Sequence, residues 1–268
     1  MQVKLNIFFN ISHNKTMIDL IDECSKDLRL QNYKLSKDRR YGVEVATLFV
    51  ENKKQAKMTG FDQGDYVIIT SPLTHFLDKE CHDYVGEILK KNISRMMKNE
   101  NLKKGQKDLI VGLGNSQILA DALGIKTLDK IEISPFDKNN HVYKFTPSVF
   151  LSTGIDSFEM VHVLAIWLGV DYVILIDSLA TTNIKRLGVS IQINSAGLTP
   201  GSAVHNKGKK ISKETLGIPC FAIGVPLMFL ADKALDDCPK ELILTPKDIH
   251  ENIDTLAYII SSAINKVI

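Results

Sequence analysis

The segment DYVILIDS, residues 171–178, decides how this chain folds, because it is a continuous apolar run that ends in an aspartate and a serine. A strand that is apolar on both faces is typical of a parallel sheet covered by helices on both sides. Similar strands are expected before and after it. They are residues 42–51, 64–72, 108–115, 144–151, 188–197, 219–226 and 241–246.

Amphipathic or apolar segments at helical spacing lie between several of these strands. The clearest are residues 76–100, 155–170 and 248–268. Strands that alternate with helices predict an α/β fold of three layers, a mostly parallel sheet with helices on both faces. We expect residues 41–268 to form a single domain. Residues 1–40 are expected to be a separate N-terminal region, either a local cap or a pro-region.

Composition excludes several classes of protein without indicating a chemistry. The 268 residues carry 33 Lys and Arg against 31 Asp and Glu, and this net charge of +2 excludes a strongly basic nucleic-acid binder. The four cysteines form no CxxC pair, which is typical of reduced thiols. No signal peptide or membrane span is apparent, so a cytoplasmic protein without a membrane partner is expected.

Two aspartates follow predicted strands and are the candidate catalytic residues. Asp177 ends the apolar run 171–178, and Asp121 follows the strand-and-turn segment 108–115. Active sites of parallel sheets lie at the carboxyl ends of the strands, where two carboxylates can share a proton, activate a water or hold a metal. For each aspartate the alternative interpretation is an ordinary helix cap.

Polar turn segments near these strand ends are candidates for binding a substrate backbone. One is the glycine-rich turn after residues 108–111, another leads into the helix at 155–170, and the third is the long polar loop 197–207. An N-cap through Thr153 or Asp156 is the simpler interpretation of the second segment. The candidate substrate-binding residues are Gly114, Asn115, Thr153, Gly154, Ser202 and Asn206.

An ordered set of short motifs resembles the spore germination protease family. Similarity is clear from about Leu109 to the C-terminus and extends faintly back to about Tyr41. The motifs are Val111-Gly112-Leu113-Gly114-Asn115, Asp121-Ala122-Leu123-Gly124, Thr153-Gly154-Ile155-Asp156, Ile176-Asp177-Ser178-Leu179-Ala180, Ile191-Gln192-Ile193, Pro200-Gly201-Ser202, Glu214-Thr215-Leu216-Gly217-Ile218-Pro219, Ala222-Ile223-Gly224-Val225-Pro226 and Thr245-Pro246-Lys247-Asp248.

The resemblance implies an atypical, aspartic-type endopeptidase that degrades small acid-soluble DNA-binding proteins during spore germination. It implies a zymogen, a homo-oligomer (a tetramer), and a location in the forespore or spore core. It places the proposed catalytic carboxylates on Asp121 and Asp177, with no required cofactor. The implied fold is phosphorylase/hydrolase-like and similar to that of hydrogenase maturation proteases, whose acidic residues bind a metal.

The chain also departs from the family pattern. Ala120 and Ile125 stand where prolines usually flank the aspartate that matches Asp121, and residues 131–134 replace an expected Thr-Arg-His. These differences indicate a divergent member. They leave open a catalytically degenerate protein that binds spore proteins without cleaving them.

Two further alternatives remain at this stage. A metal-assisted, maturation-type peptidase could bind zinc or another divalent ion through Asp121, Asp177 and His205. Peptidyl-tRNA hydrolase also begins with a strand followed by Gly-Leu-Gly-Asn. That enzyme needs a catalytic histidine soon afterwards and a basic RNA-binding face, neither of which this sequence has. Direct binding of nucleic acid is therefore not expected.

Overall fold

In the computed structural model, nine strands of the described residues form one sheet at the centre of the protein. The structure describes residues 33–37, 41–71, 78–133, 141–201, 208–235 and 238–268. The strand order is β1-β2-β3-β7-β8-β6-β4-β5, and β9 pairs with β8 outside this path. The strands are β1 (Tyr33–Lys37), β2 (Glu44–Val50), β3 (Gly64–Thr70), β4 (Asp108–Gly112), β5 (Val142–Phe145), β6 (Tyr172–Thr181), β7 (Ser190–Asn194), β8 (Cys220–Leu230) and β9 (Ile243–Leu244).

The parallel part of the sheet is confined to four neighbouring strands. β8, β6, β4 and β5 run parallel, whereas β1, β2, β3 and β7 pair antiparallel in succession, and β7 and β9 are antiparallel to β8. The predicted α/β class is confirmed, and the parallel order is limited to β4, β5, β6 and β8. β2 and β3 pair antiparallel although the segment between them contains α2.

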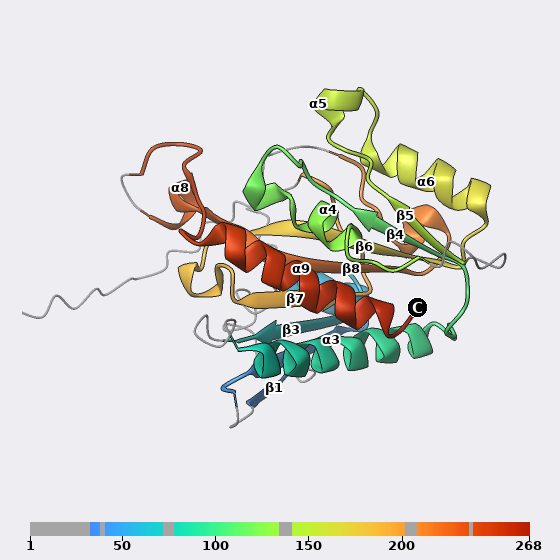
Figure 1. The fold of residues 1–268 in the computed structure, drawn as a ribbon, viewed down its shortest axis with the longest axis horizontal. Helices are drawn as coiled ribbons and strands as arrows, with labels where there is room; N and C mark the ends of the chain where they lie inside the picture. Colours follow the sequence, from blue (N-terminus) through green and yellow to red (C-terminus); the bar gives the residue numbers. More distant parts are fainter. Residues whose placement is uncertain (1–32, 38–40, 72–77, 134–140, 202–207, 236–237) are drawn as a thin grey trace, which may run out of the picture.

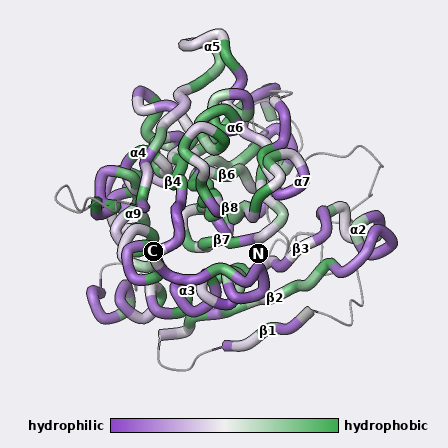
Figure 2. The backbone as a smooth tube through the Cα atoms, turned by 90° about the vertical axis from the view of Figure 1, so that its right-hand side faces the viewer, coloured by the Kyte–Doolittle hydropathy of each residue, from purple (hydrophilic) through white to green (hydrophobic). Residues whose placement is uncertain are grey.

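Helices cover both faces of the parallel strands, as the apolar runs predicted. Figure 2 shows α4 and α9 on one side of β4, β6 and β8, with α6 and α7 on the other. α3 packs beside α9 and covers β3 and β7. The long α3 and α9 also run side by side across the sheet in Figure 1. The helices are α2 (Lys53–Thr59), α3 (Lys79–Asn99), α4 (Leu123–Leu128), α5 (Phe150–Thr153), α6 (Ser157–Leu168), α7 (Lys213–Leu216), α8 (Ala231–Ala234) and α9 (Ile249–Asn265), with short 3-10 helices η2 (Leu119–Asp121) and η3 (Ile184–Arg186).

Alternate residues of β6 enter two different cores. Ile174 and Ile176 pack in the core that contains α3 and α9, whereas Val173 and Leu175 pack in the core beneath α6. All four side chains are fully buried. The uninterrupted apolar run therefore has the expected physical cause, which is burial on both faces.

Several expected strand boundaries were wrong. Residues 144–151 were expected to be one strand, but β5 ends at Phe145, and Phe150–Thr153 form α5 instead. β8 was expected to end at residue 226, but it continues to Leu230. β6 was expected to end at 177–178, but it continues to Thr181. Its extension pairs with the equally long β8, so the strand continues beyond the point where its other neighbour, β4, stops.

The outer face of α6 remains exposed and apolar. Trp167 is 79% exposed and Leu151, in α5, is 96% exposed. Phe150, Ile155, Val163 and Ile166 are each at least half exposed. We call these six residues the α5–α6 apolar face. An apolar surface of this kind is typical of a protein contact.

Within the described residues, no helix is long and apolar enough to cross a membrane.

Candidate active site

The site is built at the carboxyl end of β4, where the chain leaves the sheet. β4 pairs with β6 as far as Gly112 opposite Ile176. The next residue, Leu113, still donates its main-chain N–H to the carbonyl oxygen of Ile176, at 2.8 Å. This bond keeps the first residue of the turn beside Asp177, which follows Ile176 in β6.

Gly114 makes the sharp turn that brings Asp121 back to the strand end. Its φ of +110° lies in a region that residues with a side chain rarely adopt. A β-carbon at this position would overlap the carbonyl oxygen of Asp121 and lie 3.2 Å from the carboxyl carbon of the same residue. Only glycine therefore allows this close approach.

A main-chain hydrogen bond closes the turn. The N–H of Asn115 donates to the carbonyl oxygen of Asp121, at 3.1 Å. The side-chain oxygen of Asn115 accepts a bond from the N–H of Gln117, at 2.9 Å, which holds the turn from within. Gly114 and Asn115 thus have clear positioning roles, while their predicted contact with substrate stays a prediction.

Gly124 holds the following helix against the same strand end. A β-carbon on Gly124 would lie 2.5 Å from the carbonyl oxygens of both Ile176 and Leu113. The backbone of α4 therefore packs directly on the main chain of β4 and β6. This contact fixes where η2, and hence Asp121, lies relative to Asp177.

Asp121 does not cap a helix, so that alternative was wrong. It is the last residue of η2, and α4 begins after Ala122 without any side-chain cap. The Asp121 side chain is half-buried beside the turn. Burial raises the pKa of its carboxyl from 3.8 to about 6, although hydrogen bonding to the backbone of Asn115 opposes the rise. A carboxyl that titrates near neutrality suits acid–base chemistry.

Asp177 lies inside β6 and does not cap a helix either. It is only 8% exposed, and its Oδ1 accepts a hydrogen bond from the main-chain N–H of Ser178, at 2.8 Å. Its partner in β8 is Gly224, which presents no side chain beyond a hydrogen to this part of the sheet. Burying a carboxylate in an apolar strand is costly, so its retention here favours a functional role.

The two aspartates belong to the same edge of the parallel strands. Two main-chain bonds connect them, from Asn115 to Asp121 and from Leu113 to Ile176. The strand-end argument predicted this common location. The roles of both residues as catalytic groups stay a prediction.

The other predicted binding residues lie in two places. Thr153 ends α5 and Gly154 follows it in the left-handed conformation, at an exposed corner before α6. Asp156 caps α6 by accepting from the N–H of Phe158, at 2.8 Å, which confirms the simpler interpretation of this segment. Ser202, His205 and Asn206 lie outside the described residues.

The metal alternative depends on one of those undescribed residues. Across the ranges that the structure describes, no three His, Cys, Asp or Glu side chains lie together as metal ligands would. The described part of the proposed site thus supplies two carboxylates. Because His205 is outside it, the third ligand stays a prediction.

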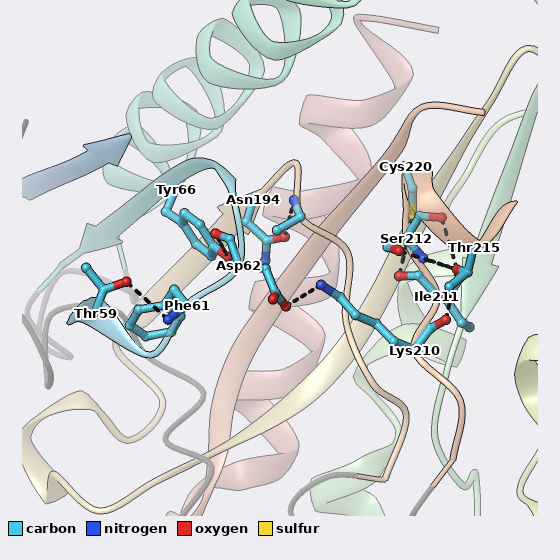
Figure 3. A network of polar contacts seen from close by, with 11 residues as sticks. Thr59, Phe61, Asp62, Tyr66, Asn194, Lys210, Ile211, Ser212, Thr215 and Cys220 are labelled. Carbon is cyan, nitrogen blue, oxygen red and sulfur yellow. Dashed lines mark hydrogen bonds and ion pairs between the residues drawn. The ribbon is translucent and has the colours of Figure 1, made fainter. Parts of the chain in front are cut away.

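A hollow of about 750 Å³ lies at the opposite end of the parallel strands, near where β8 begins. Ser195 and Ala196, which line it, follow β7 where that strand pairs with the beginning of β8. Lys210 bridges the hollow to Asp62, as Figure 3 shows. Because Asp121 and Asp177 lie at the carboxyl ends of the parallel strands, this hollow is separate from the candidate active site.

Two residues of this site, Gly124 and Ser178, are not among the candidates selected from the sequence. The useful signal was glycine spacing, because Gly112, Gly114 and Gly124 surround the turn that carries Asp121. Gly112 packs as closely, since a β-carbon there would lie 2.6 Å from the carbonyl oxygen of Gly124.

Comparison with known proteins agrees with the resemblance seen in the sequence. The family model described as germination protease matches residues 13–238. The germination protease of Caldanaerobacter subterraneus subsp. tengcongensis is 28% identical, over 91% of this chain and 90% of that protein. The germination proteases of a Geobacillus species and of Bacillus subtilis are 35% and 32% identical, over 69% and 72% of this chain. This chain spans about half the length of those two relatives, 52% and 55%.

A solved structure is also similar in part. A [NiFe] hydrogenase maturation protease from Thermococcus kodakarensis aligns with 59% of this chain and 92% of its own, at 18% identity and a TM-score of 0.37. The sequence matches extend through both aspartate-bearing segments, since the family model covers residues 13–238. On that extent of match, the chain belongs to the germination protease family of peptidases.

Proposed function

We propose that this chain is an endopeptidase that degrades small acid-soluble, DNA-binding spore proteins during germination, with Asp121 and Asp177 as its catalytic pair. Family membership supports the peptide-bond chemistry. The observation that carries the assignment of the pair is the glycine-lined turn, which holds a half-buried Asp121 at the end of β4, where the main chain bonds to Ile176, the residue before Asp177. Neither carboxyl is used as a helix cap.

The proposed reaction needs one base and one acid. Since the pKa of Asp121 is about 6, this carboxyl is mostly ionised at neutral pH and can accept a proton from the attacking water. Asp177, in its protonated form, would donate its proton to the oxygen of the scissile carbonyl. When the tetrahedral intermediate collapses, the proton taken from the water passes from Asp121 to the departing amine, and the hydroxyl of the intermediate returns its proton to Asp177, so the C–N bond breaks with no net change in the enzyme.

The decisive experiment is cleavage of a purified spore protein by matched variants. Asp121→Asn and Asp177→Asn should each lower kcat by about 100-fold or more, because each removes an acid–base group. Asp171→Asn is the control, since Asp171 lies just before β6, at the amino end of that strand. Its carboxylate accepts a hydrogen bond from the main-chain N–H of Lys107, at 2.9 Å. Full activity in a folded Asp177→Asn protein would refute the assignment.

The two alternatives make different predictions in the same assay. A degenerate binder would retain spore protein without cleaving it, even after proteolytic trimming of the N-terminal region. A metal-assisted peptidase would lose activity on exhaustive chelation and recover it with zinc, whereas the proposed pair requires no cofactor. Activity that survives chelation, with no metal found by elemental analysis, would support the carboxylate pair alone.

We also propose that the protein is a homo-oligomer located in the forespore or spore core. The support for assembly is the α5–α6 apolar face, which has no charged residue among its six members. An exposed apolar patch on a folded protein is typical of a protein–protein contact. The resemblance implies four copies, and sedimentation of the purified chain would give the number.

A further inference from the structure

Ser178 has a buried hydroxyl with no hydrogen-bond partner among the described residues. The residue is 5% exposed, and its Oγ is inaccessible to solvent. An unsatisfied buried hydroxyl costs free energy, and hydroxyls in native proteins rarely remain in that state. Its position directly beside Asp177 makes a role in the site the natural explanation.

The side chain of Ser178 faces the segment that carries Asp121. Along a strand, residues two apart share a face. Ile176 lies on the face covered by α4, and Ala180 packs with Ala120 of η2 in one small cluster. Ser178 stands between them on that face. Its hydroxyl is therefore enclosed beneath η2 and the start of α4.

The main chain of the same residue is already bound to the other carboxyl. The N–H of Ser178 donates to Oδ1 of Asp177, at 2.8 Å. One residue thus holds Asp177 through its backbone while its hydroxyl is directed toward the segment of Asp121. A hydroxyl has one proton to donate, and a carboxylate is the strongest acceptor that this segment offers.

We propose that Ser178 is a positioning residue of the peptidase, whose hydroxyl donates a hydrogen bond to the carboxylate of Asp121 when substrate is bound. The proposal rests on the function proposed above and adds a third group to the pair. Catalytic hydrogen bonds are often long in the absence of substrate and shorten in the complex. The bond would orient the carboxylate toward the attacking water while leaving the substrate-binding surface unchanged.

The test is steady-state cleavage of a spore protein by Ser178→Ala, Ser178→Thr and Ser261→Ala. Loss of a hydrogen bond to a charged group should lower kcat by about 10-fold to 100-fold in Ser178→Ala, with KM unchanged. Ser178→Thr keeps the hydroxyl and should restore most of kcat. Ser261→Ala is the matched control, since Ser261 is 2% exposed and its hydroxyl donates to the carbonyl oxygen of Tyr258 in its own helix, at 3.0 Å.

The outcomes separate this inference from the proposed function. If wild type cleaves spore protein and Ser178→Ala retains its kcat, the positioning role is wrong and the function stands. If wild type does not cleave, or Asp121→Asn remains fully active, the function itself fails. Covalent labelling of Ser178 by a fluorophosphonate probe would also overturn the proposal, because the hydroxyl would then be a nucleophile.

Discussion

The main-chain N–H of Leu113 donates to the carbonyl oxygen of Ile176 at 2.8 Å, so the end of β4 and the residue before Asp177 are directly bonded. Every other feature of the site is arranged around this bond. Gly114 turns the chain immediately after it, and Gly124 packs on the carbonyl oxygens of both bonded residues. The site should therefore be sensitive to any atom added at these glycines.

Gly114→Ala should destabilise the protein by more than about 3 kcal/mol, because the new methyl group combines left-handed backbone strain with overlap on Asp121. Urea unfolding measures this change. Gly169→Ala is the control, since Gly169 has a φ of +61° but nothing within 4 Å of its added β-carbon. It should cost only about 1 kcal/mol. Equal costs at the two positions would contradict the crowding argument.

Gly124→Ala and Gly86→Ala should have opposite effects, although both glycines are helical. At Gly124 the methyl group would be 2.5 Å from two carbonyl oxygens, so a loss of about 2–4 kcal/mol is expected. At Gly86, in α3, the nearest atom is 3.8 Å away, and removing a helical glycine should stabilise by about 0.5–1 kcal/mol. Thermal unfolding of both variants tests the contrast.

Peptidase activity should fall as the pH drops below 6. Burial raises the pKa of Asp121 to about 6, so the carboxylate that acts as base is progressively protonated below that value. The measurement is kcat/KM against pH from 4.5 to about 8. A rise in activity on acidification would instead make Asp121 the acid of the pair and reverse the assignment of roles.

The free energy of unfolding should fall as the pH rises, because of a second buried carboxyl, that of Asp108 at the beginning of β4. Asp108 is fully buried, and its Oδ1 has no hydrogen-bond partner within the described residues, while Tyr172 donates to Oδ2 at 3.2 Å. Burial raises the pKa of Asp108 from 3.8 to about 7. The folded state thus binds this proton more tightly than the unfolded chain does.

The stabilisation from Asp108 is complete below about pH 4 and is lost as the pH rises through 7, a total of about 4 kcal/mol. Urea unfolding at several pH values would measure it. Asp108→Asn should flatten this dependence. Tyr172→Phe should steepen the pH dependence. The hydrogen bond from Tyr172 favours the charged form of Asp108, so removing it raises the pKa of Asp108 further. An unchanged profile in Asp108→Asn would refute the assignment.

The paired substitution Val163→Glu and Ile166→Glu should dissociate the proposed oligomer. Both residues are about two-thirds exposed on α6, at 65% and 66%, so charges there disrupt a contact between copies without disturbing the core. Light scattering gives the mass of each species. Met58→Glu, on α2 and 52% exposed, is the control that should leave assembly intact. A monomeric wild type would exclude the proposed assembly.

Local pattern was enough to predict most of the strands and the three long helices, because burial on one or both faces imposes a period on the sequence. It did not predict β1. It failed where a strand boundary depends on a neighbour. β6 continues past Asp177 only because β8 pairs with it, and residues 150–153 form α5 although they are apolar enough for a strand. Neighbouring strands are selected by long-range contacts, which periodicity does not contain.

The same division applies to the site. The residue order alone determined the α/β class, the family resemblance and the choice of Asp121 and Asp177. Only the tertiary structure decided that neither residue caps a helix, that Gly124 touches the main chain of β4 and β6, and that the Ser178 hydroxyl is enclosed. Such features depend on segments that are about fifty residues apart in the sequence, as Gly124 and Ile176 are, and packing and hydrogen bonding across the sheet bring these segments together.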